Sequence, residues 1–166
     1  MKADGKLPAG QVPIWQTECG IVYNQSNAIL RALGVKHGYY PIGFDKNWAC
    51  DFVIDTFEDL GATGVFKPFL TEDKLTSEQQ DNLVKGMDKV NDILERHLES
   101  HHDWRLIAGN EISIGDFKAL ARYHSTALNK TKKHPEVTEK WLRNLETYPL
   151  LSAYLDRAAV PFKEYL

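Results

Sequence analysis

The chain has 166 residues and a formal net charge of −3 at pH 7, with 20 Lys and Arg against 23 Asp and Glu. Domains usually hold about 100 to 200 residues, so this length allows one domain or two small ones and excludes a large multidomain assembly. The acidic balance removes any general attraction to phosphate backbones or anionic lipids, so we expect neither nucleic acid nor a membrane as a partner.

Two cysteines, Cys19 and Cys50, are too few for a disulfide framework in a chain of this length. Such usage is typical of a reducing compartment. The first eleven residues lack an apolar signal region, and no later stretch approaches the roughly 18 apolar residues of a membrane span. We therefore expect a cytoplasmic protein.

The first third of the chain predicts a β-hairpin followed by a helix. Two β-prone runs, at 12–15 and 21–23, flank a short segment whose Gly20 can adopt the positive φ of a turn. Apolar residues at helical spacing then predict a helix over 25–33, with Gly34 placed as its left-handed end. The segment 35–44 contains two glycines and a proline, which predicts a connector.

The remainder of the chain predicts helices. Apolar residues recur every three or four positions over 48–60 and again over 83–98, which indicates two long amphipathic helices. Ser113 lies three residues before Asp116, the spacing of a capping box that opens a further helix. Pro149 is suited to the first position of a last helix. The fold class is therefore mainly α, and a hairpin this small needs further sheet or a covering helix to be stable.

Two features near the hairpin, at Val12-Pro13 and at Gln25-Ser26, predict a binding site for a peptide that carries a carboxylate. We call this site the seat. A helix that starts at Gln25 and Ser26 offers free backbone N–H groups, a positive dipole end and a hydroxyl. Val12 precedes Pro13, and if that bond is cis the backbone N–H and C=O of Val12 point outward and can pair with a peptide. The structural alternative is that Ser26 only caps a helix and Pro13 only lies at a sheet edge.

Six segments in order carry a resemblance to a known family: GQVP, QSNAILRALG, HGYYP, CDFVIDTFEDL, LIAGNEISIGDF and YPLLSAYLDR. Together they resemble the cytosolic glutathione S-transferases of the sigma, mu, pi and alpha group over nearly the whole chain. The resemblance implies a partial thioredoxin-like, glutathione-binding domain over 1–36 and an all-α domain over 45–166. It also implies glutathione as co-substrate, a small electrophile as second substrate, and a homodimer.

The resemblance further implies roles for individual residues. Gln25 and Ser26 match the site of the γ-glutamyl carboxylate, and Asp55 matches the acidic residue that reaches the γ-glutamyl amine in the partner subunit. Val12 matches the residue whose backbone pairs with the cysteinyl part of glutathione, and Pro13 matches the cis-proline. Gln11 matches a contact to the glycyl end. Ser113 and Asp116 match the helix cap that the family needs for folding.

The chain departs from the family pattern at its front. The family begins with a strand, a helix and a strand that carry the catalytic Tyr, Ser or Cys, and a βαβ unit needs about 30 or more residues. Only eleven residues precede Val12. We therefore expect a shortened thioredoxin-like part, no identifiable catalytic residue, and weak or absent conjugation of glutathione to electrophiles. The alternative is a non-catalytic member of the fold, used for assembly or ligand binding.

Two other groups were weighed as sites. His97 and His101 form an i, i+4 pair that could chelate zinc, but the sequence fixes no third ligand. Cys19 could act as an exposed nucleophile, although a plain turn residue is the stronger interpretation. We expect no metal and no cofactor beyond glutathione as co-substrate.

Overall fold

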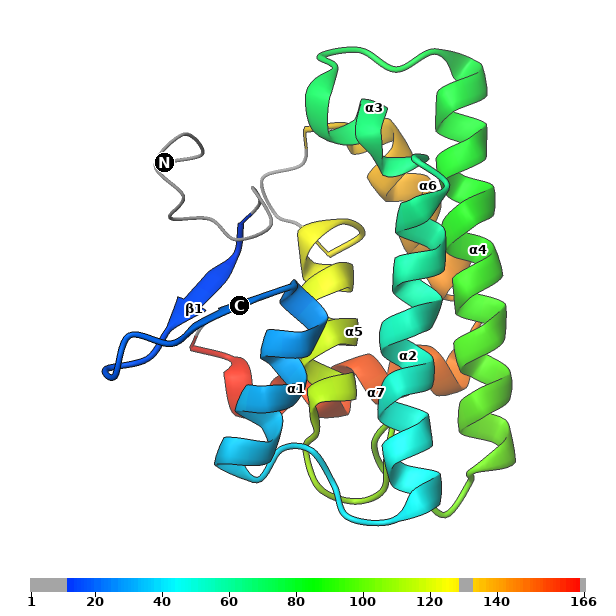
Figure 1. The fold of residues 1–166 in the computed structure, drawn as a ribbon. Helices are drawn as coiled ribbons and strands as arrows, with labels where there is room; N and C mark the ends of the chain where they lie inside the picture. Colours follow the sequence, from blue (N-terminus) through cyan, green and yellow to red (C-terminus); the bar gives the residue numbers. More distant parts are fainter. Residues whose placement is uncertain (1–11, 129–132, 165–166) are drawn as a thin grey trace.

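The computed structural model describes residues 12–128 and 133–164, and Figure 1 shows their arrangement. A two-stranded antiparallel hairpin, β1 (Ile14–Gln16) and β2 (Val22–Asn24), leads into helix α1 (Ser26–His37). The other helices are α2 (Phe44–Ala62), α3 (Phe66–Thr71), α4 (Ser77–Ser100), α5 (Ile114–Ser125), α6 (Pro135–Leu145), α7 (Pro149–Ala159) and the 3-10 turn η1 (Val160–Phe162). The mainly α class, with a hairpin and helix ahead of an all-α part, is confirmed.

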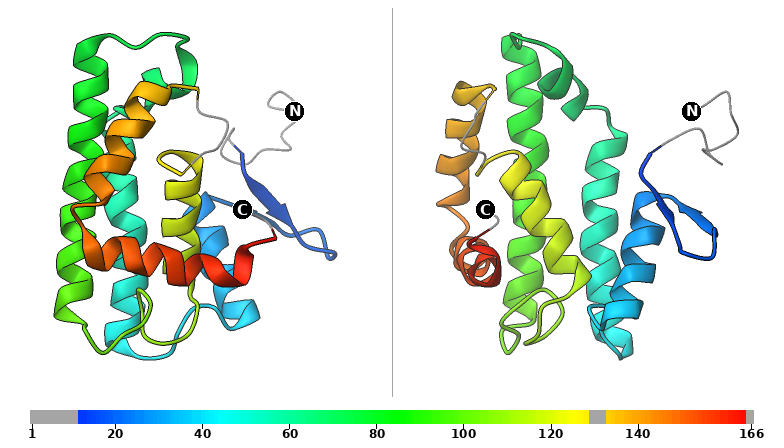
Figure 2. Two further views of the ribbon diagram at one scale, coloured as in Figure 1. Left: turned by 180° about the vertical axis from the view of Figure 1, so that it is seen from behind. Right: turned by 90° about the vertical axis from the view of Figure 1, so that its left-hand side faces the viewer.

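The helices form a bundle around α2 and α4, which run in opposite directions side by side (Figure 1). Helix α5 packs on α2, while α6 and α7 pack on α4. The hairpin and α1 lie on one side of this bundle and α6 and α7 on the other, as Figure 2 shows. Within the described residues, no helix combines the length and the apolar composition that crossing a bilayer demands.

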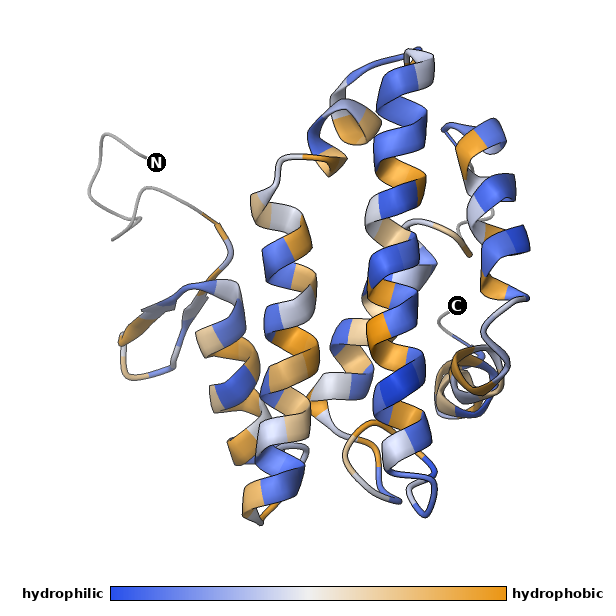
Figure 3. Cartoon of the chain, turned by 90° about the vertical axis from the view of Figure 1, so that its right-hand side faces the viewer, coloured by the Kyte–Doolittle hydropathy of each residue, from blue (hydrophilic) through white to orange (hydrophobic). Residues whose placement is uncertain are grey.

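The two long amphipathic helices are confirmed, and most of their predicted inward residues are buried. Apolar and polar residues alternate along each turn of α4 (Figure 3), and its residues Leu83, Met87, Val90, Leu94 and Leu98 are buried. On α2, Ala49, Val53, Phe57 and Leu60 are buried, but Phe52 is half-buried and Trp48 is 48% exposed. Its ring stacks on Phe52 at a centroid distance of 5.0 Å, so it covers the edge of the core from outside.

The predicted end of the first helix is wrong. Helix α1 continues past Gly34 to His37, and Gly38 is the left-handed residue that ends it, with φ 79°. Gly34 is buried inside the helix, where a Cβ would come within 2.5 Å of a methyl group of Ile114. Close packing against another helix, and not a turn, therefore explains this glycine. The connector that we predicted from residue 35 begins only after Gly38.

The predicted capping box at Ser113 and Asp116 is confirmed and lies in the core. Asp116 Oδ2 accepts hydrogen bonds from the backbone N–H and the hydroxyl of Ser113, at 2.8 and 2.7 Å. Its Oδ1 accepts from the N–H of Ile107 at 3.1 Å and from the hydroxyl of Tyr154 at 2.9 Å. Burial raises the pKa of Asp116 and these hydrogen bonds oppose the rise. One carboxylate thus joins α5, the preceding loop and α7.

His97, one of the two histidines weighed as zinc ligands, is buried in the last turn of α4. Its Nε2 lies 2.9 Å from the carbonyl oxygen of Ile107, and its ring lies 5.3 Å from that of Phe52 and 4.5 Å from that of His101. Burial lowers the pKa of His97, while the hydrogen bond to Ile107 opposes this and the nearby His101 adds to it. The neutral imidazole is therefore the form that this site favours.

We predict that Asp116→Ala costs about 3 kcal/mol or more of the free energy of unfolding, because it leaves buried donors of three residues unpaired. The exposed capping box at the start of α4 is the matched control, since Thr76 and Gln79 make the same reciprocal contacts in solvent. Thr76→Ala should cost only about 1 kcal/mol. Urea unfolding of both variants measures the difference, and equal costs would contradict the central role of Asp116.

We also predict that His97 makes the protein less stable in mild acid. Because its pKa is lower in the folded state, the unfolded chain binds the proton more tightly. The contribution of neutral His97 is therefore complete above an ordinary histidine pKa of about 6.5 and is lost as the pH falls toward the folded value. Thermal unfolding at pH 7.5 and 5.5 should show a smaller loss of Tm in His97→Gln than in the parent. An equal loss of Tm in the variant and the parent would contradict this role of His97.

Candidate functional site

The hairpin register places the Val12-Pro13 and Gln25-Ser26 segments at the same end of the hairpin. Ile14 pairs with Asn24, Trp15 with Tyr23 and Gln16 with Val22. Pro13 precedes and Gln25 follows the last of these pairs, Ile14 and Asn24, so both segments leave the hairpin at that end. The Val12-Pro13 peptide bond is cis.

The first turn of α1 leaves its backbone donors available. Gln25 precedes the helix with φ 68° and makes no capping hydrogen bond from its side chain, and the first turn carries no acidic residue. The N–H groups at the start of an α-helix have no partner within the helix and lie at its positive dipole end. Ser26 and Gln25 are exposed, so their side chains are accessible from solvent at the same point. This arrangement suits an anionic group such as a carboxylate.

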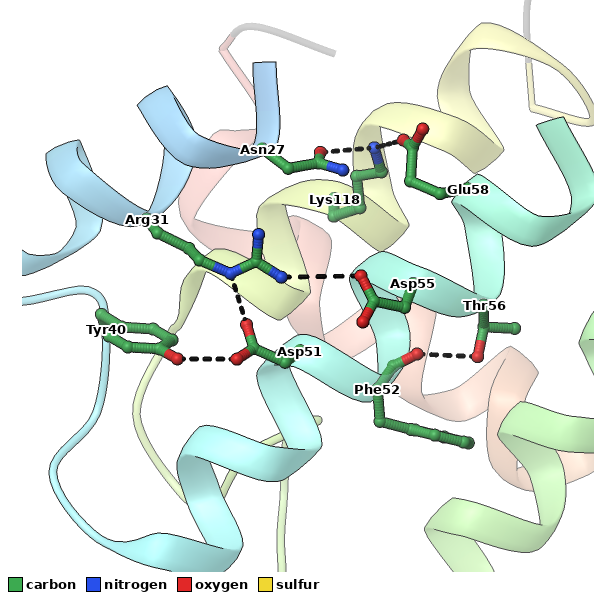
Figure 4. A network of polar contacts seen from close by, with 9 residues as sticks. All are labelled: Asn27, Arg31, Tyr40, Asp51, Phe52, Asp55, Thr56, Glu58 and Lys118. Atoms are coloured by element: carbon green, nitrogen blue, oxygen red, sulfur yellow. Dashed lines mark hydrogen bonds and ion pairs between the residues drawn. The ribbon is translucent and has the colours of Figure 1, made fainter. Parts of the chain in front are cut away.

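A set of polar contacts fixes α1 against the helical bundle (Figure 4). Lys118 of α5, with a side chain only 15% exposed, bonds to the side chains of Asn27 and Glu58. The hydrogen bond from Lys118 is the main reason that the pKa of Glu58 is lowered. Asn27 follows Ser26 directly, so this chain of contacts holds the helix start on which the seat depends.

A second set of contacts lies one turn further along α1. The Nε of Arg31 donates to Asp51 Oδ1 at 2.7 Å, and an Nη of Arg31 lies 3.5 Å from Asp55 Oδ1. The hydroxyl of Tyr40 donates to the other oxygen of Asp51 at 2.9 Å. Burial, followed by this hydrogen bond, raises the pKa of Tyr40, so the phenol keeps its proton. These contacts tie α1 to α2 and to the connector between them.

The structure places four of the predicted site residues at the same end of the hairpin. Val12 and Pro13 precede β1, Gln25 and Ser26 follow β2, and Gln11 lies outside the described residues. Asp55 lies on α2 with a side chain 69% exposed, and within its own chain it contacts Arg31 rather than the seat. Lys118 was missed by sequence reasoning. The available signal was a lone lysine beside the apolar Phe117, Ala119 and Leu120 on a predicted inward face.

The other two candidate groups have local partners. The Oγ1 of Thr17 lies 3.1 Å from the Sγ of Cys19, and this hydrogen bond is the main reason that the pKa of the exposed Cys19 thiol is lowered. His101 Nδ1 lies 2.9 Å from the carbonyl oxygen of His97. Among the described residues, no three His, Cys, Asp or Glu side chains gather in a way that could hold a metal ion.

A hollow of about 530 Å³ lies between the end of α2 and the middle of α4, away from the seat. Its walls are apolar in large part, with charged side chains at the edge. The residues that line it include Thr56, Asp59, Leu60, Val65, Lys89, Val90 and Ile93.

Comparison with known proteins agrees with this geometry. No protein-family model matches the chain. Glutathione S-transferase P 1 of Xenopus laevis is 31% identical over 164 residues, which is 95% of this chain and 68% of the relative. The solved chain of the Onchocerca volvulus pi-class glutathione S-transferase has a TM-score of 0.72 at 20% identity, covering 99% of this chain and 74% of that one.

The solved chains called NaGST1 and NaGST-2 have TM-scores of 0.73 and 0.72, at 21% and 20% identity. Each covers 96% of this chain, and this chain covers 74% of each. The structural likenesses establish the shared fold, and the identity to the Xenopus protein extends over nearly the whole of this chain. The chain therefore belongs to the glutathione S-transferase family.

Proposed function

We propose that the chain binds glutathione at the end of the hairpin and takes part, as a homodimer, in the conjugation of glutathione to small electrophiles. The hairpin register supports this proposal, because the pair of Ile14 and Asn24 places the backbone of Val12 and Pro13 and the start of α1 at the same end of the hairpin. Both described cysteines are free, which fits a reducing compartment, and we place this function in the cytoplasm.

The seat suits the γ-glutamyl end of glutathione. The carboxylate would accept from the free N–H groups of the first turn of α1 and from the Ser26 hydroxyl, with the Gln25 side chain beside it. The backbone of Val12 would pair with the cysteinyl residue of glutathione in the manner of an added strand. We assign the glycyl end to Gln11. We also propose that Asp55 serves the γ-glutamyl amine of glutathione held by the partner subunit.

We assign no hydroxyl of the described residues to the sulfur of glutathione, because the Ser26 hydroxyl is assigned to the carboxylate. Thr17 lies in the turn at the opposite end of the hairpin, where it is hydrogen-bonded. A thiol with a pKa near 8.5 is only about 3% ionised at pH 7. Without a donor that stabilises the thiolate, we expect slow conjugation. This observation favours the second candidate function, a non-catalytic glutathione-binding member of the family.

A second copy of the chain would cover the hollow between α2 and α4. Its apolar wall includes the half-buried Ile93, and Asp59 and Lys89 supply charges of both signs at its edge. A surface of this kind can contact its own copy across a two-fold axis, because each charge then has an opposite charge available. The exposed Asp55 lies one helical turn before Asp59 on α2, so the residue that we assign to the partner's glutathione lies beside this surface.

We predict that glutathione binds this chain with a dissociation constant of ~1 mM or weaker, since the contacts described here hold only one end of it. Ser26→Ala should weaken binding about fivefold, the loss of one hydrogen bond worth ~1 kcal/mol. Ser77→Ala is the matched control, because Ser77 is also exposed and also the first residue of a helix. Isothermal titration calorimetry measures all three affinities.

Conjugation of an aromatic chloride, followed in the same samples, separates binding from catalysis. A slow rate whose pH dependence follows the free thiol would favour the non-catalytic function. Micromolar affinity in the parent, or equal affinities in Ser26→Ala and Ser77→Ala, would refute the seat as described.

We predict a homodimer, with twice the 18.9 kDa mass of the chain in light scattering at tens of micromolar. Ile93→Arg should shift this mass to that of the monomer, because it places an unpaired charge on the apolar wall of the α2 and α4 hollow. Ile42→Arg, at a residue 98% exposed and outside the hollow, should leave the mass unchanged. A monomeric parent, or a dimer that survives Ile93→Arg, would contradict this interface.

A further inference from the structure

Two arginines lie between neighbouring hollows on the far side of the bundle from the hairpin. Arg105 belongs to the loop between α4 and α5, and Arg157 to the last turn of α7. Both residues line a hollow of about 370 Å³ and an adjoining hollow of about 400 Å³. We call this surface the arginine ridge. It shares no residue with the hollow between α2 and α4.

The backbone under the ridge is held by several hydrogen bonds. The Nε of Arg157 donates to the carbonyl oxygen of Arg105 at 3.2 Å, which ties the end of α7 to the loop. The N–H of Arg105 donates to the side chain of Asn110 at 3.0 Å, and that of Leu106 donates to the carbonyl oxygen of Gly109 at 2.8 Å. The backbone that carries both arginines is therefore held in place by these hydrogen bonds. Within the described residues the Nη groups of Arg157 have no partner, so they are available for a ligand.

The two arginines of the ridge have no ion-pair partner within the described part of the chain. No described carboxylate lies within ion-pair distance of Arg105 or Arg157, whereas Arg31, Arg96 and Lys118 each have such a partner. The carboxylate of Glu95, close by in the fold, is used by the N–H groups of Leu150 and Leu151 at the start of α7. Asp103, Glu111 and Asp156 adjoin lining residues in the sequence, but none of them forms an ion pair with either arginine.

The two hollows beside the ridge have apolar walls. One is lined by Leu98, Trp104 and Leu150, with His102 at its edge. The other is lined mainly by Leu106, Ile112, Ala158, Val160 and Pro161. Leu150 is 43% exposed and Val160 56% exposed, so apolar surface remains open to solvent on both sides of the arginines. Arginine and tryptophan are the residue types enriched where protein surfaces bind partners.

We propose that the arginine ridge binds an extended acidic segment of a partner protein, in which an Asp or Glu lies between two apolar residues. The carboxylate would meet the guanidinium groups, with which it forms forked hydrogen bonds, and each apolar side chain would enter one hollow. In an extended segment, residues two positions apart face the same side, so the apolar, acidic and apolar residues occupy alternate positions. The ridge and its two hollows share no lining residue with the hollow that we assign to a second copy.

The test uses the whole chain and the blocked peptide acetyl-Leu-Ser-Glu-Ser-Phe-amide, whose one charge is the glutamate. In two-dimensional NMR of the labelled protein, the amide signals of Arg105, Leu106, Arg157 and Ala158 should shift and saturate with a dissociation constant below ~1 mM. The same peptide with glutamine in place of glutamate should bind at least ~10-fold more weakly. No shift at ~2 mM peptide, or equal binding of both peptides, would overturn the proposal.

Variants of the protein provide the second arm. Arg105→Gln with Arg157→Gln should weaken the binding of the glutamate peptide at least ~10-fold and leave the glutamine peptide unaffected. Arg143→Gln is the matched control, because Arg143 is exposed on α6 and has no described ion-pair partner. If the double variant does not fold, the comparison of the two peptides on the unchanged protein still decides. Shifts that cluster on another surface, or that persist in the folded double variant, would refute the ridge as the site.

Discussion

The buried carboxylate of Asp116 is the group on which the arrangement of the helical bundle most depends. A charge in an apolar interior is costly unless donors surround it, and here three separate segments supply them through Ser113, Ile107 and Tyr154. Burial also raises the pKa of Tyr154 far above its ordinary value, so that phenol remains a donor. Because the donors come from a helix start, a loop and a distant helix, loss of the carboxylate would release all three together. The loop that carries Arg105 and the helix that carries Arg157 are thus held by the same group.

The seat at the start of α1 is fixed by a different set of contacts. A two-stranded hairpin has little stability of its own, so its position must come from the bundle. Helix α1 transmits that position through Lys118, which joins Asn27 to Glu58, and through Arg31, which joins Asp51 (Figure 4). The amine of Lys118 is on a side chain only 15% exposed, and it has both a carboxylate and an amide oxygen as partners. These contacts are therefore less weakened by solvent than an ion pair on the open surface. The geometry of the seat therefore depends on residues that do not line it.

Local sequence rules predicted the features that depend on a few neighbouring residues. The spacing of Ser113 and Asp116 predicted the start of α5, and the turn at Gly20 predicted the hairpin that pairs Ile14 with Asn24. Gly34 misled the same rules, because a glycine that ends a helix and one that admits a neighbouring helix look alike in sequence. The short α3 was not predicted, and the partners of Lys118 and Arg157 lie 52 to 91 residues away, beyond any local pattern.

Helix α2 joins the two parts of the molecule to which we assign the proposed function. Asp55 contacts Arg31 of α1 on one side, and Thr56 and Asp59 line the hollow on the other. Asp59 lies four positions after Asp55, which is about 6 Å along a helix. A second copy placed on the hollow would therefore lie within about one helical turn of an exposed carboxylate that is already oriented by α1. Binding at the seat and association at the hollow would then both depend on the position of α2, so a change that moves this helix against α1 should affect both.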